Sequence, residues 1–122
     1  MHQQGALAYQ KTAKVVESSR ERESALLMRA AASLQKVKDD WPNTTAEEMN
    51  AALNFNRKLW TIFMSSVTKE TSPLPTEIRQ NIANLGLFVM NQTREMVMEP
   101  EARKLDVLVR LNRQIAAGLR GM

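Results

Sequence analysis

The stretch Asn43–Val67, NTTAEEMNAALNFNRKLWTIFMSSV, decides the fold of this 122-residue chain. Thr44 and Thr45 are each followed by a glutamate three residues later, which is the spacing of a capping box at the start of a helix. Apolar and amide residues then recur every three or four positions, at Met49, Leu53, Asn56, Trp60, Phe63 and Val67. This period predicts an amphipathic helix that packs against others. Phe55, Leu59 and Ile62 widen its apolar arc beyond what one neighbouring helix would cover.

The same reasoning predicts four more helices, over about 6–17, 18–41, 75–98 and 100–120. Ser18 and Glu21 have the spacing of another capping box, and Pro42 pushes the residue before it out of helical geometry. Pro100 is suited to a first helical turn, where its missing amide costs nothing. We therefore expect an all-α fold, a compact single-domain bundle of about five helices over residues 6–122. The polar run Met1–Gly5 is expected to be a flexible N-terminal segment.

The composition argues against an enzyme. The chain has no cysteine, and its one histidine is His2, so disulfides, thiolate chemistry and His-ligated metals are not expected. The carboxylates lie near predicted helix ends, and no Gly-rich phosphate loop is present. We expect no catalytic residue, no cofactor, no metal and no small-molecule substrate. The sequence also has neither a run of about 20 apolar residues nor a signal peptide, so a cytoplasmic protein without a membrane span is expected.

The net charge of +4 comes from the C-terminal end, where residues 103–122 carry five basic residues and one acidic residue. Four of the basic residues form a stripe opposite the apolar side of the last helix: Arg103, Arg110, Arg113 and Arg120. The stripe has three readings, namely a solvated face, a contact with an acidic protein, or a contact with RNA phosphates. None of the six aromatic residues lies in this segment, which disfavours RNA because stacking partners are missing.

The helix predicted over 75–98 carries two apolar stripes. One consists of Ile78, Ile82, Leu85, Val89, Gln92 and Met96, and the other of Ala83, Gly86, Leu87, Met90, Val97 and Met98. A helix that is apolar on both sides must be covered twice, either within its own domain or by a partner. Methionines often only fill a core, but flexible thioethers also suit a groove that accepts an apolar helix. We expect the second stripe to bind a partner through Leu87, Met90, Val97 and Met98.

Amide side chains fall directly in predicted apolar seams, at Asn56, Gln92 and Asn112. Such amides either fix the register of the helices by hydrogen bonds across the core or bond the backbone of a partner. Spacing alone leaves both alternatives open. Trp60 is expected in the core, and Trp41, at a helix end, is the more exposed of the two tryptophans.

Three runs of the chain resemble the FlaF family of flagellar biosynthesis regulators from alphaproteobacteria. They are NRKLWTIF at 56–63, the segment from Leu74-Pro75 through EIRQNIANLGLFV at 77–89, and LNRQIAAGL at 111–119. An early AYQ at 8–10 and RERE at 20–23 resemble the opening of that family. The resemblance covers nearly the whole chain from about Ala6.

The resemblance implies a small cytoplasmic helical protein, without a reaction or cofactor, that is needed for flagellin production and export. It also implies action together with FlbT, a regulator of flagellin translation. Matching polar and aromatic positions are expected to contact partners: Asn56, Arg57, Trp60, Arg79, Asn81, Asn84, Asn112 and Arg113. The predicted function is a chaperone or adaptor that binds flagellin, FlbT or both and couples flagellin synthesis with export. The alternative is an RNA-binding regulator of flagellin messenger translation that uses the basic C-terminal helix.

Overall fold

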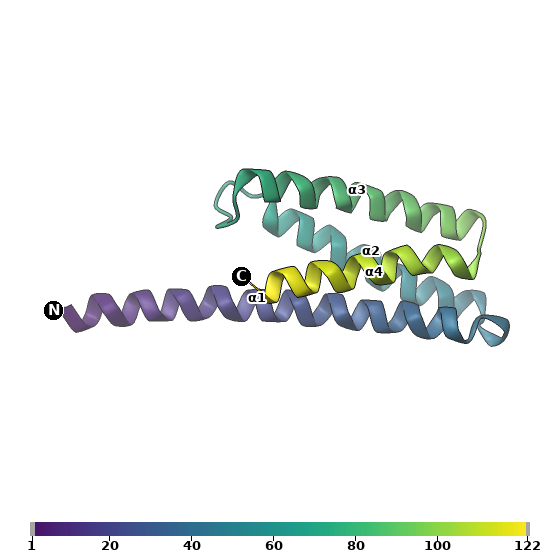
Figure 1. Cartoon of the computed structure of the whole chain (residues 1–122), viewed down its shortest axis with the longest axis horizontal. Helices are drawn as coiled ribbons and strands as arrows, with labels where there is room; N and C mark the ends of the chain where they lie inside the picture. The colour runs from purple at the N-terminus through teal and green to yellow at the C-terminus, as the bar shows by residue number, and fades with distance from the viewer. Residues whose placement is uncertain (1, 122) are drawn as a thin grey trace.

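The computed structural model is an all-helical bundle, and it describes the backbone of residues 2–121 and the side chains of residues 19–121. Four α-helices make up the chain: α1 (His2–Asp39), α2 (Ala46–Val67), α3 (Thr76–Met98) and α4 (Ala102–Arg120). A short 3-10 helix, η1 (Trp41–Asn43), joins α1 to α2. Successive helices run in opposite directions, and α1 packs along both α2 and α4 (Figure 1). The expected all-α class is confirmed, and the described residues contain no strand.

The expected number of helices was wrong, because the chain has four rather than about five. The segments predicted as separate helices over 6–17 and 18–41 form the single helix α1. No proline or glycine interrupts the chain between Ala6 and Trp41, so the helix continues through the capping-box spacing at Ser18 and Glu21. Such a spacing caps a helix only where the preceding backbone is not already helical. The flexible segment predicted over residues 1–5 lies outside the part of the chain whose side chains are described.

The other boundaries follow local chemistry. Thr45 is the N-cap of α2, where its Oγ1 accepts a hydrogen bond of 3.1 Å from the backbone amide of Glu48. The α1 helix ends just before η1, as the proline at position 42 requires. The start of α4 differs slightly from expectation, because Glu101 is the N-cap and Pro100 precedes the helix.

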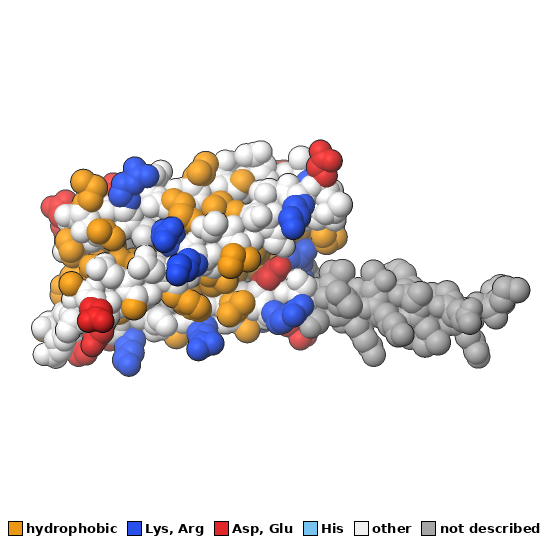
Figure 2. All heavy atoms as spheres, turned by 180° about the vertical axis from the view of Figure 1, so that it is seen from behind, with side chains coloured by type: hydrophobic (Ala, Val, Ile, Leu, Met, Phe, Trp, Pro, Cys, Tyr) orange, Lys and Arg blue, Asp and Glu red, His pale blue; other side chains and the backbone are white. Residues whose placement is uncertain are grey.

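The inner sides of all four helices form one apolar core. Every member of the seam predicted on α2 is buried, and Trp60 packs edge-to-face on Phe63 with ring centroids 5.6 Å apart. Gly86 of α3 lies against the side chain of Met64, so the missing Cβ lets α2 and α3 approach closely. Some large apolar side chains nevertheless remain on the surface over α1, α2 and α3 (Figure 2).

Candidate functional site

A buried amide cluster connects three helices. Asn112 of α4 accepts a hydrogen bond of 2.8 Å from the indole Nε1 of Trp60 and donates one of 2.7 Å to Asn56 Oδ1. Its Nδ2 also lies 3.3 Å from the backbone carbonyl oxygen of Leu27 in α1. Asn56, Trp60 and Asn112 are fully buried. Of the two alternatives for these amides, the structure therefore favours hydrogen bonds across the core, and none of the three side chains faces solvent.

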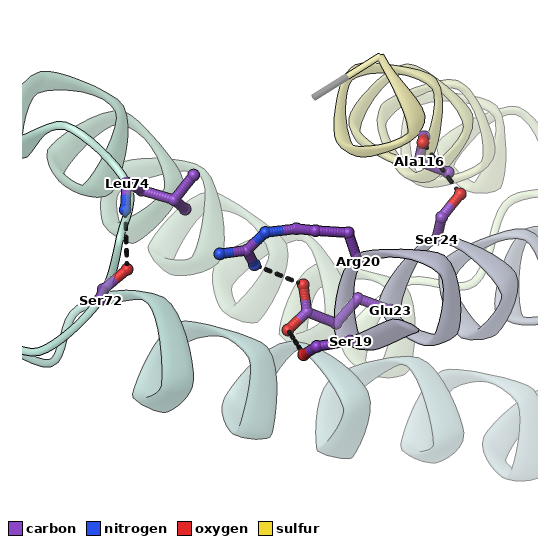
Figure 3. A network of polar contacts seen from close by, with 7 residues as sticks. All are labelled: Ser19, Arg20, Glu23, Ser24, Ser72, Leu74 and Ala116. Carbon is purple, nitrogen blue, oxygen red and sulfur yellow. Dashed lines mark hydrogen bonds and ion pairs between the residues drawn. The ribbon is translucent and has the colours of Figure 1, made fainter. Parts of the chain in front are cut away.

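Further polar contacts hold α1 in place. The hydroxyl of Ser24 donates a hydrogen bond of 2.9 Å to the carbonyl oxygen of Ala116 in α4 (Figure 3). One turn earlier and within α1 itself, Arg20 pairs with Glu23 at 2.8 Å, and Ser19 donates to the same carboxylate. The Ser24 bond thus ties α1 to α4, whereas the contacts of Ser19, Arg20 and Glu23 stay within one helix.

The second stripe of α3 is largely uncovered. Leu87, Val97 and Met98 are 62%, 55% and 78% exposed, and Met90 is half-buried. We call these four residues the α3 surface. The chain's own helices thus leave the outer part of this stripe uncovered, whereas Gly86 is buried beneath Met64.

The polar candidates from the family resemblance lie in different places. Arg57, Asn81 and Asn84 are exposed, and Asn84 accepts a hydrogen bond of 3.2 Å from Gln80. Arg79 is half-buried and donates to the carbonyl oxygen of Lys69 at 3.1 Å. It thereby ties the first turn of α3 to the preceding connection.

The basic stripe on α4 is divided and partly paired. Arg103 lies 2.6 Å from a carboxylate oxygen of Glu101, and Arg110 lies 3.4 Å from one of Asp106. Asp106 also accepts a hydrogen bond of 2.8 Å from Lys38 of α1. That bond and the Lys38 charge lower the pKa of Asp106, with smaller contributions from Arg110 and Arg113.

Arg113 and Arg120, the other two arginines of the stripe, are exposed. Arg110 borders a groove between α3 and α4, whereas Arg113 borders a hollow shared with Asp39, the last residue of α1, and with Asp40. The four arginines thus do not present one unpaired row, and this geometry favours the solvated reading of the stripe.

Two apolar features escaped the sequence reasoning. Phe88, 41% exposed, borders the groove of about 390 Å³ between α3 and α4, together with Leu85, Val107 and Leu111. Leu26 of α1 is exposed beside the buried Leu27. The sequence could have indicated both, because each is a large apolar residue directly before a buried residue of its helix, Val89 for Phe88 and Leu27 for Leu26.

The described residues also bear on metal binding and on membrane insertion. No group of three or more His, Cys, Asp or Glu side chains there is placed to hold a metal ion. Within the same residues, no helix combines the length and the apolar content that crossing a membrane requires.

The fold and surface define a small four-helix bundle whose distinctive residues are exposed apolar side chains around a closed polar core cluster. The chain belongs to the FlaF family: the family described as Flagellar protein FlaF matches residues 6–119. This match confirms the resemblance drawn from the sequence runs. Comparison with curated proteins and with solved structures gave no match.

Proposed function

We propose that this chain is a non-enzymatic, cytoplasmic adaptor of flagellum biogenesis that binds flagellin, FlbT or both and couples flagellin synthesis with export. Membership of the FlaF family supports a flagellar role. The identity of the partners comes from the sequence resemblance.

The observation that carries the binding role is the α3 surface. Its three most exposed side chains, Leu87, Val97 and Met98, are each more than half exposed. Burial of apolar area contributes roughly 25 cal/mol per Å², so a partner that covers them gains free energy that the monomer does not realise. The thioethers of Met90 and Met98 can adapt to the shape of an incoming helix.

The amphipathic terminal helix of a flagellin subunit would be a suitable occupant of this surface. It would lay its apolar side along α3, as in helix-in-groove recognition. An ordinary interface of this kind buries about 800 Å² on each partner. Covering the terminal helix would keep a subunit from assembling before export.

Isothermal titration of flagellin and of FlbT against the wild type and Leu87→Asp tests the proposal. The matched control is Phe88→Asp, which places the same charge about 100° around the same helix, beside the groove between α3 and α4. We expect Leu87→Asp to weaken binding by at least about tenfold, a change of ~1.4 kcal/mol, and Phe88→Asp to bind like the wild type. Circular dichroism establishes that both variants fold. Unchanged affinity in Leu87→Asp, or no binding of either partner, contradicts the proposal.

A gel shift with flagellin messenger RNA distinguishes the RNA-binding alternative from the adaptor proposal. Single-stranded binding would lose about 0.7 log units of affinity per log unit of salt for each phosphate contacted. The pairing of Arg103 and Arg110 with carboxylates argues against it. A steep salt dependence without any binding of flagellin or FlbT would replace the adaptor with the RNA-binding role.

A further inference from the structure

A second apolar strip lies on the outer side of the α1–α2 seam, away from the α3 surface. Leu26, Phe55 and Ile62 are 39%, 36% and 69% exposed, and Leu59 is half-buried beside them. Phe55, Leu59 and Ile62 are spaced i, i+4, i+7, so they share one side of α2. A groove of about 420 Å³ continues the strip between Val37 and Phe55.

Cationic side chains flank this strip on both helices. On α1 they recur at intervals of seven residues, at Arg22, Arg29 and Lys36, and all three are exposed. Seven residues are close to two helical turns, so the three lie in one row with steps of about 10.5 Å. On α2, the strip is bordered by Lys58, which is also exposed.

None of these four cations forms an ion pair with another residue whose side chain is described; the pairs found there involve other residues. Acidic residues reach this side at its ends, and Asp40 and Glu48 border the groove at one of them. Figure 2 shows hydrophobic side chains interspersed with Lys and Arg on this face, with Asp or Glu at both ends. The surface therefore combines an apolar centre with a positively charged rim.

We propose that this basic-rimmed α1–α2 surface docks one amphipathic helix of another protein, whose apolar stripe is flanked by Asp or Glu at intervals of seven residues. A helix in coiled-coil-like packing repeats every seven residues, which matches the spacing of the α1 cations. Acidic flanks complement the rim and favour this partner over neutral or basic helices. The proposal goes beyond the α3 surface and would let the bundle hold two partners at once.

The shape argues against two other occupants. Phe55 is more than half covered and borders a hollow, which receives projecting side chains. Insertion in a bilayer instead needs apolar side chains that project, and of Leu26, Phe55 and Ile62 only Ile62 is more than half exposed. A second copy of this chain would set the same four cations against each other, because a two-fold contact pairs identical surfaces.

The test uses three labelled peptides of about 21 residues, three heptads long, with one apolar stripe and flanking positions that are all Glu, all Gln or all Lys. Fluorescence anisotropy against the full chain is expected to rank them Glu, Gln, Lys, with about tenfold between the first and the last. Binding of the Glu peptide should weaken with salt, since the Debye length falls from about 30 Å at 0.01 M to about 3 Å at 1 M.

Two variants locate the contact. Ile62→Asp and Arg29→Glu should each weaken the Glu peptide by about tenfold, whereas the control Phe88→Asp, at an exposed apolar residue outside both surfaces, should bind it like the wild type. Arg29→Glu should in turn bind the Lys peptide more tightly than the wild type does. This gain of binding distinguishes a direct contact from loss of fold.

Several results would overturn the proposal: no binding of the Glu peptide, equal binding of the Glu and Lys peptides, or no effect of Ile62→Asp. Co-sedimentation with phosphatidylserine vesicles that Ile62→Asp abolishes, without peptide binding, would assign the surface to membranes instead. None of these results would change the outcome expected when flagellin and FlbT are titrated against Leu87→Asp. The proposal for the α1–α2 surface can therefore fail without the proposal for the α3 surface failing.

Discussion

Replacing Asn112 by alanine should destabilise the bundle far more than replacing its neighbour Asn56. Asn112 accepts the hydrogen bond of the Trp60 indole N–H and donates one to Asn56. Water cannot replace it as a partner, because the side chains of Asn56, Trp60 and Asn112 are all fully buried. Its removal leaves that N–H and the Asn56 Oδ1 without partners. A buried polar group that loses its partner costs about 1–3 kcal/mol, so two such groups and the small cavity amount to about 3–5 kcal/mol.

The Asn56→Ala variant should lose less free energy of unfolding than Asn112→Ala. Asn56 has a buried Nδ2 without a hydrogen-bond partner, and that unpaired group disappears with the substitution. Asn112 keeps its bonds to Trp60 and to the carbonyl oxygen of Leu27. We therefore expect a loss of about 1–2 kcal/mol, mainly from one hydrogen bond and a small cavity.

Urea unfolding followed by far-UV circular dichroism measures both changes as free energies of unfolding. A domain of this size has a total stability of about 5–15 kcal/mol, so the Asn112→Ala loss is readily measured. Equal effects of the two substitutions, or a loss below about 1 kcal/mol for Asn112→Ala, would refute the cluster as the polar tie between the helices.

Three further changes test other parts of the fold. Thr45→Ala removes the N-cap hydroxyl of α2 and should lower the free energy of unfolding by about 1 kcal/mol in urea titrations. Gly86→Ala alone must displace Met64, whereas in a Met64→Ala background it should stabilise α3 by up to about 1 kcal/mol through helix propensity; loss of stability in that background would contradict the packing described. The pKa of Asp106 is lowered in the folded state by Lys38, so its stabilising effect is present above the unfolded pKa and is lost as pH falls through the folded pKa. Melting temperatures of the wild type and Asp106→Asn should therefore converge as the pH falls below about 4, and a constant difference would contradict the pairing.

Periodicity predicted most of the fold because burial repeats with the helix. Every residue of the Met49–Val67 seam is buried as expected, and the capped start of α2 lies at Thr45. The helix count failed at Ser18, because a capping-box spacing is a local signal and cannot reveal that the preceding residues are already helical.

The candidate site was less predictable, since it depends on which helix sides meet. The sequence placed Asn56 and Asn112 in apolar seams, but the pair is separated by 56 residues, so spacing could not decide whether they bond each other or a partner. Resemblance favoured Trp60 as a contact, whereas the bundle encloses it. The exposure of Leu87 and Met98 was easier to predict, because the sequence alone shows that α3 carries apolar residues on two sides.

The buried amide cluster also explains how the bundle keeps large apolar side chains on its surface. With a purely apolar seam, α2 could rotate to bury Ile62 and expose a smaller residue, since hydrophobic contacts are not directional. One residue of rotation is about 100°, which would carry Asn56 and Trp60 out of reach of Asn112 and break both hydrogen bonds. A polar group in a helix seam fixes register in this way. The core thus holds Ile62 outward, where a partner rather than the chain's own helices can cover it.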